Sequence, residues 1–278
     1  MPTFGDLKKD AAGMMGSELP PDFILAALCQ LDGQVSTDDR KTVICPLSQV
    51  IDGTSENEAK NGEYQAGWLK QLGERYQENK GDFNKGEVRF LVPILKMESG
   101  ASNSGHYFLA EVVVQGGEPP VIAVYNPTNY PDEVSSEKKE QEAQAAAKNL
   151  KACFDKLLPG KDATVSLRAG LTQCSADTHP NTCGETILMI ARQLATGQPS
   201  PAEQQQLTPD EALTMRVLAY LALAQEHVLG GAGYLSQLSK STEDMFKSQL
   251  ETMSYELYGA LDEVARTVLI DHTRGPLS

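Results

Sequence analysis

Three β-type runs follow one another in the middle of the chain, and they constrain the fold more than any other feature. The runs are Val88–Leu95, His106–Val114 and Val121–Tyr125. Each is rich in β-branched and aromatic residues and is bounded by Gly, Pro, Asn or Ser, which is typical of strands. The connections between them are short enough for neighbouring strands, and we expect the last two runs to be antiparallel. The three runs therefore predict the centre of a sheet.

Helical patterns lie before and after these runs. Apolar residues recur at helical spacing after Leu19-Pro20-Pro21-Asp22, and we expect the Asp22 carboxylate to cap that helix. The charged, alanine-rich segment 131–149 leads into an apolar stripe that ends at Pro159-Gly160, which predicts one long amphipathic helix. Further helices are predicted at residues 64–76, 184–195, 209–229 and 242–270, and shorter β-type runs at 42–47 and 163–167, with a polar loop at 52–63.

This order predicts an α+β fold in which helices flank a central mixed sheet. The 278 residues can hold either one large domain or a domain plus an appendage. We expect residues 1–18 to form an N-terminal lead-in and residues 19–196 to form the core. Residues 197–278 are expected to form a C-terminal helical extension packed on that core, introduced by the polar segment 197–206.

Charge and cysteine content narrow the classes of partner and compartment. With 24 Lys and Arg against 38 Asp and Glu, the net charge is −14, so we do not expect nucleic acid as a partner. The most apolar stretch, Val217–Ala224, is too short to span a membrane, and no signal-peptide pattern is visible near Met1. Five irregularly spaced cysteines favour a reducing, intracellular compartment over a disulfide framework.

A cysteine at the start of a predicted helix is the strongest chemical signal. Cys183 would face free N–H groups and the positive end of the helix dipole, and both favour the thiolate. Gly184 would let a substrate approach the backbone closely. A nucleophilic thiolate needs a base and a group that orients the base. His106 opens a predicted strand, and Asn126 follows the end of the next one, so Asn126 could bind one imidazole nitrogen while the other faces Cys183.

In this order, Gly105-His106-Tyr107, Val124-Tyr125-Asn126-Pro127, Gln173 and Cys183-Gly184 resemble the ubiquitin-like protease superfamily of cysteine peptidases, clan CE. That superfamily includes SUMO proteases, adenovirus-type proteases and bacterial effector deubiquitinases. The resemblance covers about residues 19–196 and implies a papain-like, ubiquitin-like-protease core.

The resemblance also implies roles for four residues. By that resemblance Cys183 is the nucleophile, His106 the general base, Asn126 the orienting residue and Gln173 an oxyanion-hole donor. Three positions depart from the family pattern: Tyr107 replaces a common Trp, Thr182 replaces a common Asp, and Gln173 lies ten residues before the cysteine instead of nearer to it. Tyr107 could still stack on the imidazole. Asp132 is the alternative to Asn126 as the orienting residue.

The function implied is that of a thiol isopeptidase removing ubiquitin or a ubiquitin-like modifier from proteins, without a cofactor. Its partners would be ubiquitin or ubiquitin-like conjugates, and a bacterial effector acting in the host cytoplasm is expected. Two alternatives stay open: an acetyl-CoA-dependent effector acetyltransferase of the same superfamily, and a binding module whose catalytic site has decayed. A zinc site built from Cys174, Asp177, His179 and Cys183 fits no common spacing.

Overall fold

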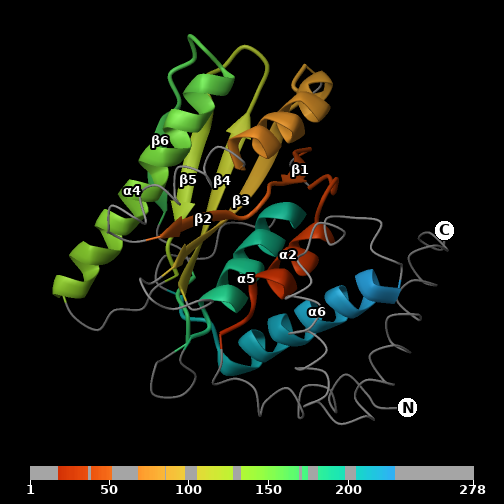
Figure 1. The fold of residues 1–278 in the computed structure, drawn as a ribbon, viewed down its shortest axis with the longest axis vertical. Helices are drawn as coiled ribbons and strands as arrows, with labels where there is room; N and C mark the ends of the chain where they lie inside the picture. The colour runs from red at the N-terminus through yellow and green to blue at the C-terminus, as the bar shows by residue number, and fades with distance from the viewer. Residues whose placement is uncertain are drawn as a thin grey trace.

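A computed structural model describes residues 18–36, 39–51, 68–84, 86–97, 105–127, 133–168, 171–174, 181–197 and 205–228. Within these ranges six strands form one mixed sheet in the order β1-β3-β4-β5-β6, with β2 also paired to β3 (Figure 1). The strands are β1 (Lys41–Ile44), β2 (Ser48–Ile51), β3 (Val88–Met97), β4 (Gly105–Val114), β5 (Val121–Tyr125) and β6 (Thr164–Arg168).

The central strands follow the predicted pattern closely. β3, β4 and β5 pair antiparallel in succession, whereas β1, β2 and β6 pair parallel to their neighbours. The predicted run 42–47 is a strand only in its first part: β1 ends at Ile44, and Cys45, Pro46 and Leu47 separate it from β2, which was not predicted. A proline has no N–H to donate to a ladder, so the pairing is interrupted there. The mixed α+β sheet predicted from the sequence is confirmed.

The described helices are α2 (Pro21–Cys29), residues 68–79, the 3₁₀ turn η1 (Lys80–Asp82), α4 (Glu133–Leu157), α5 (Cys183–Thr196) and α6 (Pro209–Val228). The predicted loop 52–63 and the predicted helix 242–270 lie outside the described residues. None of the described helices is long and apolar enough to cross a membrane.

The predicted capping role of Asp22 is wrong. Pro20 is the N-cap of α2 and Pro21 is its first residue, so Asp22 lies within the first turn. A proline at the first helical position fits because its φ is already helical and its missing N–H would have no partner there. Asp22 is buried, and burial raises the pKa of its carboxyl to about 6.

Alternation along β3 divides the core into two layers, one on each face of the sheet. Leu91 and Leu95 pack with residues of α2, α5 and α6. Phe90 and Val92 pack with residues of α4 and of the helix at 68–79. In Figure 1, α5, α2 and α6 lie together on one side of the sheet and α4 lies along the strands near β5 and β6. The result is a three-layer fold whose two helical layers bury both faces.

Helix α6, which lies within the predicted C-terminal extension, shares its apolar cluster with α2 and α5. Phe23 of α2 and Tyr220 of α6 meet edge to face, with ring centroids 4.8 Å apart. The predicted division at residue 196 therefore falls between helices that contribute to one continuous cluster.

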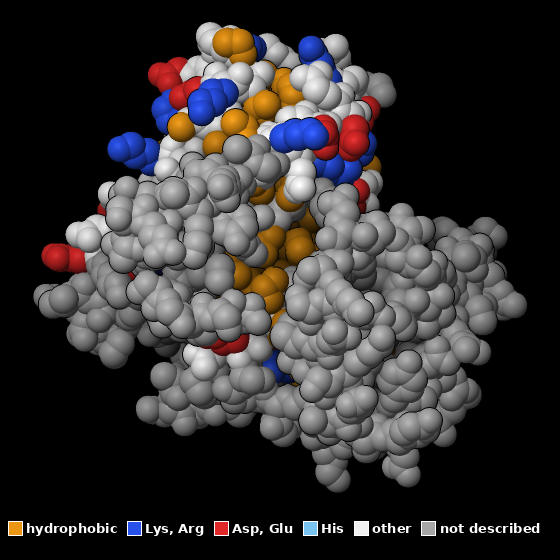
Figure 2. Space-filling model, in the orientation of Figure 1, with side chains coloured by type: hydrophobic (Ala, Val, Ile, Leu, Met, Phe, Trp, Pro, Cys, Tyr) orange, Lys and Arg blue, Asp and Glu red, His pale blue; other side chains and the backbone are white. Residues whose placement is uncertain are grey.

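On the face in Figure 2, hydrophobic side chains form a band down the middle of the described part, with charged side chains of both signs above it. Lys and Arg stand beside Asp and Glu there, so this described part of the face carries no continuous basic patch.

Candidate active site

His106 and Asn126 meet at the end of the sheet where β5 stops. Tyr125, the last residue of β5, pairs with Leu109, so the first four residues of β4 extend past it. His106 lies in this overhang, and its Nε2 is 2.8 Å from Oδ1 of Asn126, which directly follows β5. The two side chains that the sequence places together are thus in hydrogen-bond contact.

The start of β4 holds the imidazole tightly. A Cβ on Gly105 would lie 2.3 Å from the backbone oxygen of Lys96, so only glycine fits beside β3 at that point. The Gly105 N–H donates to Oε2 of Glu18 at 3.1 Å. The ring against the imidazole is Phe108, edge-on at 4.9 Å between centroids. Tyr107 points to the opposite face because side chains alternate along a strand, so the suggested stacking of Tyr107 on the imidazole is wrong.

Cys183 is the first residue of α5 and packs in the same cluster as Tyr107. The backbone N–H groups of Tyr107 and Gly184 face the thiol and lower its pKa. Burial has the larger effect, with help from the carboxylates of Glu185 and Glu18, and raises the pKa of Cys183 to about 12. The sequence-based expectation of a resting thiolate is therefore wrong, because desolvation outweighs the helix N-terminus.

The Tyr107 amide places the thiol relative to His106. Beyond Leu109 the β5 side of β4 has no strand partner in the ladder, so an amide there can face Cys183. Tyr107 is the residue next to His106, and Asn126 occupies the same end of the sheet. Cys183 therefore lies beside the backbone of Tyr107, the residue next to His106, at the end of the sheet that Asn126 also occupies.

Gln173 is tied to both sides of this end of the sheet. Its backbone N–H donates to the oxygen of Pro127, next to Asn126, at 2.8 Å. The following N–H, from Cys174, donates to Oγ1 of Thr182 at 2.9 Å, immediately before Cys183. The ten-residue separation between Gln173 and Cys183 is thereby closed in space. Thr182 is fully buried, and the bond that its hydroxyl accepts ties Cys174 to the residue before Cys183.

The absence of a Cβ at Gly184 lets α5 pack closely against Ile24 of α2 and the preceding Leu19. A Cβ at this position would lie 2.9 Å from Cδ1 of Ile24 and 3.2 Å from Cβ of Leu19. Real Cβ atoms essentially never approach other atoms within 3.0 Å, so the end of the Ile24 side chain would have to shift and Leu19 would have to give by a few tenths of an ångström. The sequence predicts a role for Gly184 in substrate access, whereas the contacts in the structure give it a packing role between α5 and α2.

Two charged residues of this region, Glu185 and Arg216, were not predicted from the sequence as part of the site. Glu185 lies two positions after the thiol, and Arg216 of α6 binds it in a fully buried ion pair, Nε to Oε1 at 2.6 Å. Arg216 directly precedes the apolar stretch at 217–224, and an arginine inside an apolar helix face is a signal of a buried partner. No pattern in the sequence identifies that partner.

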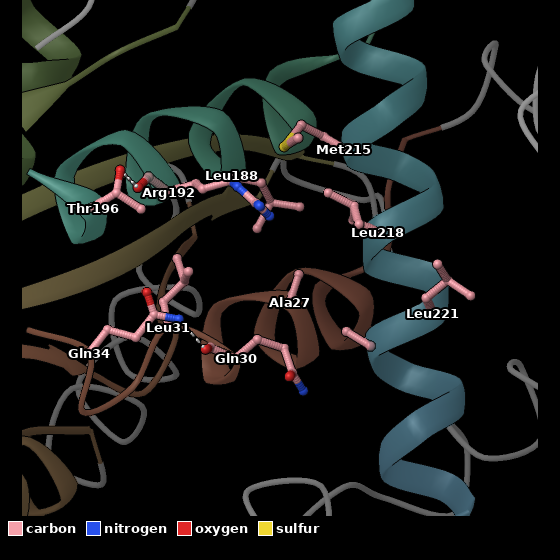
Figure 3. A pocket seen from close by; sticks show the side chains of 11 residues that line it. Ala27, Gln30, Leu31, Gln34, Leu188, Arg192, Thr196, Met215, Leu218 and Leu221 are labelled. Atoms are coloured by element: carbon pink, nitrogen blue, oxygen red, sulfur yellow. Dashed lines mark hydrogen bonds between the residues drawn. The ribbon is translucent and has the colours of Figure 1, made fainter. Parts of the chain in front are cut away.

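A cavity of about 330 Å³ lies between α2, α5 and α6. Figure 3 shows Ala27 of α2, Leu31 in the turn after α2, Leu188 of α5 and Leu218 of α6 around it, with Arg192 as its charged residue. None of the four predicted catalytic residues lines it.

The remaining sequence alternatives fall mostly outside the described residues. Asp177 and His179 of the zinc alternative, and the alternative orienting acid Asp132, lie in undescribed segments. Within the described ranges, no three or more His, Cys, Asp or Glu side chains gather in a way that could hold a metal ion. All five cysteines are free thiols.

No protein-family model and no curated protein sequence matches the chain. Among solved structures, the Legionella pneumophila effector protein RavZ is similar at 12% identity and a TM-score of 0.48, over 92% of this chain and 92% of that one. The SUMO protease Ulp1, with its catalytic cysteine oxidised to a sulfinic acid, is similar at 13% identity and a TM-score of 0.35, over 73% and 74%. The central domain of the uncharacterised Lpg1148 protein of Legionella pneumophila is similar at 10% identity and a TM-score of 0.39, over 77% and 99%. At these values the similarity is confined to the coarse arrangement of helices and strands.

Proposed function

We propose that the protein is a thiol isopeptidase that removes ubiquitin or a ubiquitin-like modifier from proteins. The observation that carries the proposal is the 2.8 Å contact between His106 and Asn126 at the sheet end where Cys183 begins α5. A helix-initial cysteine, a histidine and an orienting amide are the parts that a nucleophilic thiol site requires. The substrate class comes from the resemblance of the motifs around these residues to clan CE.

The His106–Asn126 contact determines which imidazole nitrogen is basic. When Nε2–H donates to Oδ1 of Asn126, the neutral ring keeps its lone pair on Nδ1. Nδ1 is the ring nitrogen closer to the main chain, and the next amide along that chain, from Tyr107, faces the thiol. Nδ1 is therefore the nitrogen that would take the Cys183 proton.

In the proposed reaction, the Sγ–H proton moves to Nδ1 of His106 as sulfur attacks the carbonyl carbon of the modifier's C-terminal glycine. The Cys183 N–H and Gln173 donate hydrogen bonds to the oxyanion of the tetrahedral intermediate. His106 then protonates the leaving lysine amine as the C–N bond breaks, which leaves a thioester. A water molecule that gives its proton to His106 hydrolyses the thioester and restores the thiol.

The raised pKa of Cys183 bears on the first step. A thiol with a pKa of about 12 is almost entirely protonated at neutral pH. The reaction would therefore start from a neutral thiol and a neutral imidazole, with proton transfer coupled to the attack.

The net charge of −14 suits a substrate with a basic face, because opposite charges speed association. By the same resemblance to clan CE, we propose that the protein acts as a bacterial effector in the reducing cytoplasm of a host cell.

A modifier carrying a C-terminal electrophile tests the proposal, with ubiquitin and SUMO as the first two probes. We expect a covalent adduct that maps to Cys183, disappears in Cys183→Ala and persists in Cys29→Ala, a matched change at a half-buried cysteine on α2. Acetyl-CoA-dependent labelling of Cys183 without probe capture would contradict the isopeptidase and support the acetyltransferase. A folded protein that shows neither reaction would contradict both activities.

A further inference from the structure

A buried ion pair joins the C-terminal extension to the helix that carries Cys183. Nε and Nη2 of Arg216 lie 2.6 and 2.5 Å from Oε1 of Glu185, and both side chains are completely buried. Glu185 is in the first turn of α5, two residues after Cys183. Arg216 belongs to α6 and lies 31 residues after Glu185 in the sequence.

The pair has an unusual shape for an arginine–carboxylate contact. Both arginine nitrogens converge on Oε1, and Oε2 of Glu185 is buried without a hydrogen-bond partner among the described residues. A bidentate pair would satisfy both oxygens, and an unsatisfied buried oxygen costs free energy. Buried pairs of this kind are often replaceable by apolar residues without loss of stability. Stability alone is therefore a weak reason for placing two charges beside the thiol.

The arginine is itself held by its own helix and by α2. Tyr220 lies one turn after Arg216 and forms a hydrogen bond with it. Burial raises the pKa of Tyr220, and the charge of Arg216 and this hydrogen bond partly offset that rise. Tyr220 packs edge-on against Phe23 of α2. A chain of contacts thus runs from α2 through Tyr220 and Arg216 to the first turn of α5.

We propose that Arg216 is a positioning residue for Cys183: by binding Glu185 it fixes the first turn of α5 and neutralises the negative charge beside the thiol. This inference rests on the proposed function in taking Cys183 as the nucleophile. It makes α6, and so part of the C-terminal extension, a component of the catalytic unit.

The charged and titratable groups around Cys183 come from every element packed there, and negative charge predominates. Glu185 and Glu18 both raise the pKa of Cys183. The same two carboxylates and Asp22 of α2 raise the pKa of the neighbouring Tyr107, where burial has the largest effect. Among the described residues, the positive charge that reaches this group is Arg216 of α6, through its ion pair with Glu185. Burial raises the pKa of the Glu185 carboxyl and the Arg216 charge opposes that effect, so at pH 9 the loss of Arg216 would leave an ionised Glu185 without its partner two residues from the nucleophile.

The test is the rate at which iodoacetamide alkylates Cys183 in the full-length protein at pH 9, followed by peptide mass mapping. Far below the thiol pKa the rate is proportional to the thiolate fraction. We expect Arg216→Met to slow alkylation about tenfold, equivalent to a rise of about one unit in the thiol pKa. Glu185→Gln should speed it, and Glu185→Gln/Arg216→Met should return it to within about threefold of wild type.

The double variant separates charge from packing. If Arg216 acted only as a structural element, adding Glu185→Gln would not rescue the rate. Arg89→Met is the matched control, since Arg89 is a buried arginine bound to Glu111 and to the backbone oxygen of Leu194 near the other end of α5. It should lower the unfolding temperature without changing the alkylation rate of the folded protein.

Glu185→Gln keeps the inference testable if Arg216→Met does not fold. Rates within twofold of wild type in Glu185→Gln, or a double variant as slow as Arg216→Met, would overturn the inference. The readout needs no modifier substrate, so its outcome is independent of whether the electrophilic probes are captured.

Discussion

At the scale of single residues, Asn126 has the most direct influence on the proposed chemistry. Its Oδ1 accepts from Nε2 of His106 at 2.8 Å, and this bond selects the tautomer whose other nitrogen can act as a base. Asn126 is itself buried, so water does not compete freely for the bond.

Asn126→Ala should therefore slow the capture of an electrophilic modifier by about tenfold to a hundredfold, part of the usual contribution of a general base. Asn126→Asp keeps the acceptor and should retain most of the rate. The second-order rate constant of capture measures both effects. A wild-type rate in Asn126→Ala would show that the contact does not orient the base.

Asp22 gives a prediction about pH at the same scale. Its pKa in the folded protein, about 6, lies above the value of about 3.9 expected for the unfolded chain. The folded state therefore binds the proton more tightly, and the stability linked to this group is lost as the pH rises through 6.

Asp22→Asn removes that loss. We expect the variant to be more stable than wild type at pH 7.5 and to have no such advantage at pH 3.5, where both forms are neutral. Urea unfolding at the two pH values measures the difference. An equal effect at both pH values would mean that the ionisation of Asp22 does not differ between the folded and unfolded states.

These residues also show what local sequence can predict. His106 and Asn126 follow from the ends of two predictable strands, because a strand ending fixes where the next side chain lies. Asp22 was misassigned because the two prolines place the helix start two residues earlier, with Pro20 as the N-cap. The Glu185–Arg216 pair could not be predicted, since nothing local specifies how α6 crosses α5.

At the scale of elements, α5 makes long-range contacts near both of its ends. Its first turn packs on α2 at Gly184 and binds Arg216, and the backbone oxygen of Leu194 near its last turn accepts a hydrogen bond from Arg89. Arg89 also binds Glu111 at 2.6 Å within the sheet. The sequence predicts α5 and its apolar face, but it does not indicate these long-range contacts, of which those at Gly184 and Glu185 hold the first turn of the helix.

Gly184→Ala tests the contact between α5 and α2. Alanine gains up to about 1 kcal/mol in helix propensity, but overpacking of this kind costs about 1–3 kcal/mol. We expect a net destabilisation in urea unfolding. Ile24→Val removes Cδ1, the atom in closest conflict at 2.9 Å, so Gly184→Ala should cost less in that background. Additive effects of the two changes would place the conflict elsewhere.

At the scale of the whole molecule, α6 completes the layer that covers one face of the sheet. It contributes to the same cluster as α2 and α5, and it carries the arginine that neutralises Glu185. In the sequence, the polar segment 197–206 indicates a division at residue 196. The packing of α6 across that division could not be predicted, because the pattern of an amphipathic helix does not reveal what the helix packs against.

A chain truncated after residue 196 should therefore lose cooperative thermal unfolding. It would leave Glu185 buried without its partner, at a cost of about 3–5 kcal/mol, and would expose the apolar side chains that α6 covers. A typical domain has about 5–15 kcal/mol of stability in total. Calorimetry of the truncated and full-length chains compares them, and a single sharp transition in residues 1–196 would show that the core folds without α6.

The pairing of Cys183 with His106 is the centre of this account. The most direct measurement is the rate at which an electrophilic modifier forms an adduct at Cys183 in wild type and in His106→Ala, with circular dichroism to verify folding. We expect adduct formation in wild type and a rate lower by about 10²–10⁴-fold in the variant. An adduct formed equally fast without the imidazole, or formed on a different cysteine, would contradict it.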